Sequence, residues 1–230
     1  KQLLSAIFDL ERSDEITLFT SGRKKPLLKD LLLEDHQNSY KQQHLGCSNK
    51  FLKARTVLGR TPAIDRLAKT PADLVFLPNL NYTQLPKTTP SVLTMHDLSW
   101  QLFPSFYSLR MRAWHHFLQP AKLVKNVTHL IVPSENTKQD IIKTFHKSPK
   151  AISVIPHGVP KNFFPEPIPH DLYVTSRYKL PKRFVLFMGT LEPRKNLVPI
   201  IDAIAAYRRK THDDTQLVIA GGWGWNAGAL

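Results

Sequence analysis

The chain has 230 residues, of which 42% are hydrophobic and 22% are charged, a composition typical of a water-soluble globular protein with one large or two ordinary domains. Its longest apolar runs, such as 184–188 and 217–220, are far shorter than the roughly 20 residues that cross a bilayer, so the sequence predicts no membrane span. A single cysteine, Cys47, excludes an internal disulfide framework and agrees with a reducing compartment. No secretory signal pattern opens the sequence, and we therefore expect a cytoplasmic protein.

The charge balance is strongly basic, because 32 Lys and Arg against 18 Asp and Glu give a net charge of +14. Such a charge favours anionic partners, including phosphates, nucleic acid and acidic lipid headgroups. The basic residues come in short groups, at 23–25, 182–183 and 208–210, instead of one block. These groups fit solvated faces as well as anion contacts, and charge alone does not choose between the partners.

In chain order, short apolar runs alternate with segments of helical period. This alternation indicates βαβ units with parallel sheets, and runs of continuous Val, Ile, Leu and Phe indicate sheets covered by helices on both faces. We therefore predict an α/β fold of doubly wound, Rossmann-like sheets. The predicted elements are an opening helix with Leu3, Leu4, Ile7 and Leu10, strands at 15–20, 74–77, 91–95, 129–132, 152–155, 184–188 and 217–220, and helices that are clearest at 134–145 and 197–209.

A proline-rich stretch marks a boundary between two compact units. Residues 159–182 contain five prolines, a density that resists regular structure, although a short helix is expected at 171–178. We predict an N-terminal domain at 1–159, a linker at 160–182 and a second domain that begins at 183 and includes residue 230.

The segment 184–196, FVLFMGTLEPRKN, has the pattern of a phosphate-binding turn. A buried strand is predicted to end at Gly189, and a helix starts near 195–197. Gly189 permits a phosphate to approach the backbone closely, and the helix start offers unpaired N–H groups. Arg194 and Lys195 can place positive charge beside a diphosphate. The same spacing also fits a structural turn between a strand and a helix with charges on its surface.

Polar residues follow two other predicted strands of the first domain. His96 and Asp97 come at the end of one strand, and the carboxyl ends of parallel strands form the ligand crevice of open α/β sheets. A lone histidine also fits packing or solvent exposure, and Asp97 can fix its loop by accepting backbone hydrogen bonds. Ser134 faces the same crevice, but capping of the helix that follows also explains it. Gly221, after the last strand, is a further candidate for the cleft.

The segment 184–196 resembles the start of the donor domain in group 1, family-4-like glycosyltransferases of GT-B fold, where a strand, the phrase G-T-L-E-P-R-K-N and a helix recur. Several ordered landmarks are more specific than one glycine pattern, and together they span nearly the whole chain. The other segments that resemble this family, in the right order and spacing, are VLTMHDLSW (92–100), IVPSENTKQD (131–140), VIPHGV (154–159) and LVIAGGWGW (217–225).

The resemblance implies an acceptor-side domain at 1–159 and the start of a nucleotide-sugar donor-binding domain at 183–230. It implies transfer of a hexosyl group, with mannosyl as one candidate, to a hydroxyl acceptor in polysaccharide biosynthesis, with retention of configuration and without a metal or other cofactor. Lys195 would contact the donor diphosphate with Arg194 beside it, and His96 would be the catalytic residue near the transferred sugar. Many relatives carry Arg directly after the strand glycine, where this chain has Thr190, so either Arg194 supplies that charge or Thr190 offers only its hydroxyl and N–H.

Two parts of the family pattern, the first strand with its glycine-rich loop and an acidic E-x7-E element, are not found between Lys1 and Leu230, so we expect this chain to be inactive by itself. A glycan or lipid-linked acceptor and peripheral contact with an anionic membrane surface are compatible with the basic charge. The alternatives are a basic module that binds nucleic acid or anionic surfaces, and another nucleotide-sugar enzyme such as an epimerase. The absence of one basic block disfavours nucleic acid as a partner.

Overall fold

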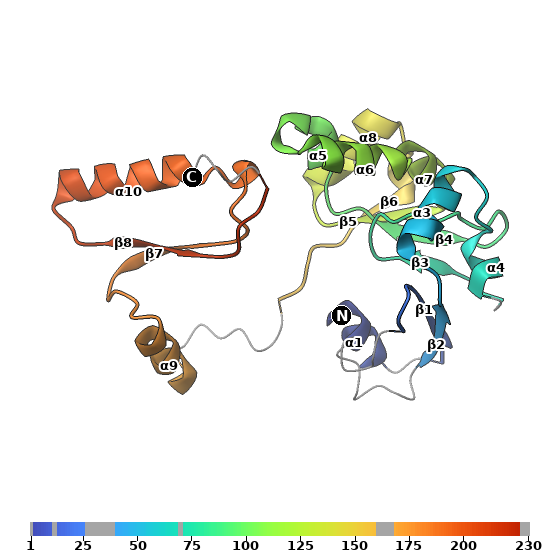
Figure 1. Ribbon diagram of the computed structural model, residues 1–230, viewed down its shortest axis with the longest axis horizontal. Helices are drawn as coiled ribbons and strands as arrows, with labels where there is room; N and C mark the ends of the chain where they lie inside the picture. The colour runs from blue at the N-terminus through green and yellow to red at the C-terminus, as the bar shows by residue number, and fades with distance from the viewer. Residues whose placement is uncertain (1, 11–12, 26–39, 69–70, 160–167, 226–230) are drawn as a thin grey trace. The chain divides into compact units, whose positions relative to one another are not determined.

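Figure 1 shows the computed structural model of the chain, which describes residues 2–10, 13–25, 40–68, 71–159 and 168–225. The chain divides into two compact units, one of Lys1–Leu98 with Trp114–Pro160 and one of Ser99–Ala113 with Lys161–Leu230. Both units contain parallel strands joined by helices, so the predicted α/β fold class is confirmed. None of the helices in these ranges combines the length and the apolar character that a membrane span requires.

The first unit is built on a four-stranded parallel sheet. All four predicted strands are present, and their ends differ from the predicted ones by at most one residue. Because the strands are parallel, their carboxyl ends meet at one edge of the sheet, where open α/β folds bind ligands. In spatial order the strands are β3 (Val75–Leu77), β4 (Ser91–Thr94), β5 (His129–Val132) and β6 (Ile152–Val154).

The core of this unit lies between the sheet and two helices, α7 (Pro120–Asn126) and α8 (Glu135–Phe145). The two helices contact each other, and α8 contacts both β5 and β6. Full burial of such apolar side chains contributes about 1.5–3 kcal/mol each, so this cluster is the main stabilising element of the unit. Its fully buried members, at 0% exposure, are Leu93, Val124, Leu130, Val132 and Ile141.

Helix α8 starts as the sequence predicts. The hydroxyl oxygen of Ser134 accepts a hydrogen bond from the Thr137 amide at 3.2 Å, and Glu135 lies in the first turn. At the other end His146 adopts a left-handed conformation with φ 53° and donates its N–H to the Ile142 carbonyl at 3.0 Å. Both helix ends are therefore satisfied by local contacts.

The remaining connections between these strands are less regular. Residues 78–90, between β3 and β4, contain no helix. A 3-10 turn, η3 (Pro149–Ala151), leads into β6. Strands β4 and β5 are joined by α5 (Ser99–Leu102), η2 (Pro104–Phe106), α6 (Leu109–Phe117) and α7.

A parallel pair, β1 (Ile16–Ser21) and β2 (Tyr40–Leu45), forms a second sheet of the first unit. Strand β1 was predicted, but β2 was missed because its sequence, YKQQHL, has neither an apolar run nor an apolar face. Polar atoms of Tyr40, Gln42 and His44, which alternate along β2, are buried without a hydrogen-bond partner in the described part of the chain. The predicted opening helix is present as α1 (Gln2–Phe8), and two further helices, α3 (Asn49–Val57) and α4 (Ile64–Ala68), follow β2.

The second unit has a parallel pair, β7 (Phe184–Met188) and β8 (Gln216–Ala220), joined by α10 (Leu197–Thr211), which runs along the two strands in Figure 1. The predicted burial of β7 is wrong, since Leu186 is 52% exposed and Met188 is 77% exposed. Among the described residues β7 has a single strand neighbour, β8. Much of the apolar surface of β7 is therefore left uncovered. The predicted helix within the linker is present and begins earlier, as α9 (Pro169–Arg177), whereas linker residues 160–167 lie outside the described part.

Residues 99–113 group with the second unit, whereas the prediction placed them in the first domain. Two contacts of these residues within this unit are made by Trp225. Its indole Nε1 donates a hydrogen bond to the Phe106 carbonyl at 2.6 Å, and its ring stacks on Tyr107 with centroids 5.8 Å apart. Aromatic side chains thus connect segments that are far apart in the sequence.

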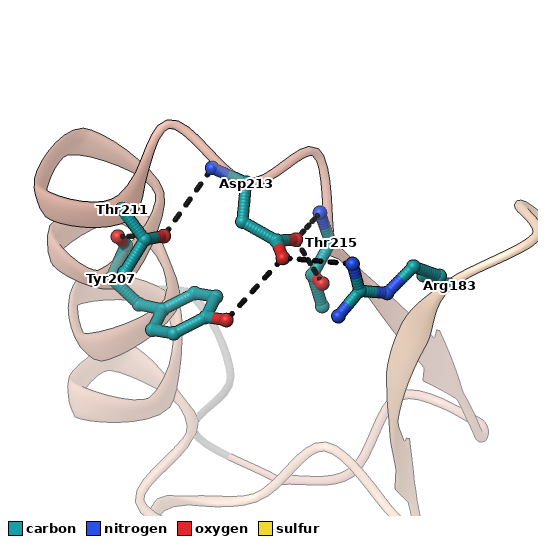
Figure 2. A network of polar contacts seen from close by, with 5 residues as sticks. All are labelled: Arg183, Tyr207, Thr211, Asp213 and Thr215. Atoms are coloured by element: carbon teal, nitrogen blue, oxygen red, sulfur yellow. Dashed lines mark hydrogen bonds and ion pairs between the residues drawn. The ribbon is translucent and has the colours of Figure 1, made fainter.

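Polar side chains join the carboxyl end of α10 to the strands, as Figure 2 shows. Asp213 Oδ1 accepts hydrogen bonds from the hydroxyl and the amide of Thr215, the latter at 2.7 Å. Asp213 Oδ2 pairs with Arg183 Nη1 at 3.0 Å and accepts a hydrogen bond from the Tyr207 hydroxyl at 3.4 Å. These contacts, the Thr215 hydrogen bonds first and Arg183 after them, hold the pKa of Asp213 below its ordinary value of 3.8.

We predict that Asp213→Asn lowers the midpoint of thermal unfolding at neutral pH. Because the native pKa is depressed, the carboxylate stabilises the fold above its ordinary pKa of 3.8, and this stabilisation is lost as the pH falls through the native pKa. Thermal unfolding of both proteins across acidic pH should therefore show the difference between them shrinking below pH 3.8. Asp214→Asn is the matched control, because the neighbouring Asp214 is exposed. An equal loss in both variants would contradict the network's role.

Candidate functional site

The candidate residues of the first unit lie at the carboxyl edge of its main sheet. Backbone pairing continues beyond the strands, since the Met95 amide donates to the Ile131 carbonyl at 2.9 Å and the Ile155 amide donates to the Val132 carbonyl at 2.8 Å. Met95 and Leu98, each 1% exposed, hold the loop between them against the core. The exposed side chains of this loop are His96 and Asp97.

The His96 imidazole has two neighbours. Its Nε2 lies 3.2 Å from the carbonyl oxygen of Pro78, which directly follows β3. Its ring stacks on His157, which follows β6, with centroids 5.4 Å apart and an interplanar angle of 29°. His157 entered the sequence analysis only as part of the segment VIPHGV, and the position of both histidines after strands of one parallel sheet was the signal for this contact.

Ser134 also lies at this edge of the sheet, because it is the second residue after the end of β5. Its hydroxyl oxygen is engaged in the cap of α8, and it lies 3.0 Å from the Thr137 hydroxyl. Capping therefore accounts for Ser134, and its presence in a ligand cleft stays a prediction.

In the second unit, the loops after β7 and β8 continue side by side. The Gly189 amide donates to the Ala220 carbonyl at 2.9 Å, and the Leu191 amide donates to the Gly222 carbonyl at 3.0 Å. Gly221 has φ +156°, and a Cβ there would lie 1.9 Å from the Gly189 carbonyl oxygen. Only glycine permits this approach, so the candidate cleft residue Gly221 has a clear packing role.

The two cations after Gly189 have different surroundings. Glu192 is 3% exposed, and its Oε1 pairs with Arg194 Nη2 at 2.6 Å. A buried carboxylate without its partner is strongly destabilising, so Arg194 is needed to compensate Glu192. No pattern around Glu192 predicted its burial, and its pairing leaves Arg194 less able to supply charge to a ligand.

Lys195 makes no ion pair with a described residue. Its side chain points toward Gly189, the residue that follows β7. A Cβ on Gly189 would lie 4.0 Å from Lys195 Cε. Asn196 then adopts φ 52°, and α10 begins at Leu197, after the short turn η4 (Pro193–Lys195). The Lys195 side chain therefore lies near Gly189, and α10 begins two residues after Lys195, while phosphate binding by these groups stays a prediction.

Thr190, between these groups, is exposed. Its methyl carbon packs near Gly224, where a Cβ would lie 2.8 Å from Thr190 Cγ2. The Gly224 amide donates to the Leu191 carbonyl at 3.0 Å, which holds this part of the loop in place. The position of Thr190 beside the loop is therefore fixed by packing, and a direct contact with a ligand stays a prediction.

This arrangement can bind an anion. The first turn of α10 offers the N–H groups of Leu197 and Val198 at the positive end of the helix dipole, whereas Pro199 has none, and the Lys195 ammonium adds a full charge. Arg194 adds little net charge because Glu192 neutralises it. No group of three or more His, Cys, Asp or Glu residues in the described ranges is arranged to hold a metal ion.

A pocket of about 460 Å³ in the first unit lies elsewhere. Its walls come from Thr56 of α3, from residues 83–87 between β3 and β4, and from residues between 117 and 126, which include parts of α6 and α7. It contains none of the predicted site residues and lies on the connections between strands, away from the residues at their carboxyl ends.

The chain belongs to Glycosyltransferase Family 4, whose model matches residues 10–163. A second model, glycosyl transferases group 1, matches residues 175–228, which include the Gly189 loop, Lys195 and Gly221. The parallel α/β architecture agrees with the GT-B, Rossmann-like fold predicted from the sequence.

A curated relative is the O-antigen chain mannosyltransferase B of Escherichia coli, which is 27% identical over 146 residues. The match covers 61% of this chain and 37% of that protein, so the chain spans little more than a third of its relative.

We predict that Gly221→Ala destabilises the second unit by about 1–3 kcal/mol, because the methyl group would collide with the Gly189 carbonyl in a backbone conformation that alanine avoids. Gly222→Ala is the matched control, since a Cβ there meets no atom within 4 Å. Denaturant unfolding of the three proteins measures both effects. Equal stability of the two variants would show that the loops separate easily.

Proposed function

We propose that the protein takes part in transfer of a hexosyl group from a nucleoside-diphosphate sugar to a hydroxyl acceptor, with retention of configuration and without a metal. The observation that carries this proposal is the position of Lys195 beside Gly189 and the start of α10, within the segment that matches glycosyl transferases group 1. Mannosyl is the first candidate sugar, because the Escherichia coli relative is a mannosyltransferase. Synthesis of a cell-envelope polysaccharide is the corresponding role.

The chemistry that these residues would supply is stabilisation of the leaving group. When the bond between the sugar and the diphosphate breaks, negative charge develops on the diphosphate. Lys195 and the N–H groups at the start of α10 would lie beside this developing charge, and they would stabilise it more than the charge of the bound donor. Arg194 acts indirectly in this proposal, because it compensates the buried Glu192 and so maintains the loop that carries Lys195.

His96 is the proposed catalytic residue near the transferred sugar. Its place at the carboxyl end of β4 supports this role, because loops at this edge of parallel sheets line ligand sites. Asp97 and Ser134 follow the ends of β4 and β5, and we propose that they line the same part of the site.

Nucleotide binding tests the donor site. We predict that one of UDP, GDP and ADP raises the thermal unfolding midpoint of the chain, and that Lys195→Ala weakens its binding tenfold or more, as expected for a lost charge-assisted hydrogen bond of about 1.5–3 kcal/mol. A ligand at 100 times its dissociation constant stabilises the native state by about 2.7 kcal/mol, which thermal shift measures easily.

Lys210→Ala is the matched control, because Lys210 lies in the last turn of the same helix, away from Gly189. It should bind the nucleotide as the unchanged chain does. Equal losses in both variants would indicate general charge attraction and support the basic anion-binding module instead. A product that retains the nucleotide on an altered sugar would indicate an epimerase.

We further propose a lipid-linked acceptor and peripheral contact with an anionic membrane on the cytoplasmic side. Residues 99–134 contain no Asp or Glu. Helix α6 in this range exposes Leu109 by 78% and Phe117 by 48%, and it carries Arg110 and Arg112. Exposed apolar side chains beside cations, with no acidic residue between them, suit a surface of acidic headgroups.

We predict that the chain sediments with vesicles that contain anionic lipid, and that the double variant Arg110→Ser, Arg112→Ser binds them roughly 30-fold more weakly, since each cation contributes about 1 kcal/mol near such a surface. The control Arg208→Ser, Arg209→Ser removes the same charge from α10 and should bind almost normally. Binding to neutral vesicles alone, or equal losses in the two variants, would overturn this surface.

A further inference from the structure

The imidazole of His96 is restrained on two sides by groups that the chain supplies from different strand ends. The carbonyl of Pro78 comes from the end of β3, and the His157 ring comes from the segment after β6. His96 itself follows β4. Three loops of one parallel sheet therefore determine the orientation of a single exposed ring.

The contact with Pro78 fixes which ring nitrogen of His96 carries the proton. A backbone carbonyl can only accept a hydrogen bond, so Nε2, 3.2 Å from the Pro78 oxygen, must be the donor. In the neutral ring Nδ1 then has a free lone pair and is an acceptor. Nδ1 makes no hydrogen bond to a described residue, so it is available to a ligand.

The backbone that leads to the stacking partner, His157, is restrained. Pro156, with its fixed φ, precedes His157, and the Ile155 amide is bonded to the Val132 carbonyl at 2.8 Å. On the other side of the contact, the buried side chains of Met95 and Leu98 hold the His96 loop. The His157 ring thus lies against His96 without a hydrogen bond of its own to any described residue.

We propose that His157 is a positioning residue, which together with the Pro78 carbonyl holds His96 with Nε2–H inward and Nδ1 free to accept a hydrogen bond from a sugar hydroxyl. The part that concerns sugar rests on the proposed function, whereas the restraint of the ring does not. A planar ring at position 157 is what the restraint requires, so phenylalanine can replace histidine there and alanine cannot.

Nuclear magnetic resonance of the ¹⁵N-labelled chain tests the restraint without any nucleotide. At alkaline pH, where histidine side chains are neutral, we expect His96 to show the Nε2–H tautomer and a nuclear Overhauser effect between the His96 and His157 rings. His96→Gln assigns the signals. In His157→Ala the His96 nitrogen shifts should move to the averaged values of a free imidazole, whereas His157→Phe should keep the restrained values.

His116→Ala, which removes an exposed histidine of α6, should leave the His96 signals unchanged. Unchanged His96 signals in His157→Ala, a missing ring-to-ring effect, or an Nδ1–H tautomer would each overturn the proposal. His157 is exposed, so its variants should fold, and unchanged amide spectra of the core would verify this.

Binding then tests the consequence for the sugar. The ratio of affinities for a nucleotide sugar and its free nucleotide should fall in His96→Gln and about as much in His157→Ala, and should be kept in His157→Phe. An unchanged ratio in His157→Ala would overturn the role toward sugar. Failure of the unchanged chain to bind any nucleotide would overturn the proposed function, while the resonance data would still decide the positioning of His96.

Discussion

Backbone pairing between parallel strands continues past the last strand residue in both units, and the candidate sites depend on this constraint. The Met95 amide bonds to Ile131 beyond β4, and the Gly189 amide bonds to Ala220 beyond β7. Each bond holds the start of a loop in register with its neighbour. The chemical groups on these loops, His96 in one unit and Lys195 in the other, therefore start from backbone positions that the sheet determines.

The two cations in the loop after β7 have different roles, because one of them pairs with a buried carboxylate. The cations Arg194 and Lys195 are adjacent and look equivalent in the sequence, but the carboxylate of Glu192 is only 2% exposed and pairs with Arg194. Without Arg194 the buried carboxylate of Glu192 would have no compensating charge, which would destabilise the loop, so Arg194 has a structural role. Lys195 is left as the cation beside the helix start, so a chain with Thr190 in place of the common arginine offers one free charge in this loop.

The sequence predicted those parts of the fold that rest on apolar periodicity. The predicted bounds of β5 and β7 are correct to the residue, and so is the prediction that Ser134 caps α8. Apolar runs and helix caps are properties of the local sequence. Strand β2 was missed because its polar sequence, YKQQHL, has neither an apolar run nor an apolar face, although it pairs with β1 along its whole length. Contacts at long range in the sequence, such as His96 with His157, could not be read from periodicity, since they depend on how strand ends meet.

The two groups of site residues are supported in different ways, and this has a consequence for ligand binding. The His96 loop is held by side chains that are 1% exposed, above a core with several fully buried residues. The Lys195 loop follows a strand whose Leu186 is 52% exposed, and it is held by the buried Leu191 and Leu197, glycine packing, backbone pairing and one ion pair. The Lys195 loop is therefore attached to the more exposed of the two strands, and a bound diphosphate would add to its stability, because ligand binding stabilises the state that it selects.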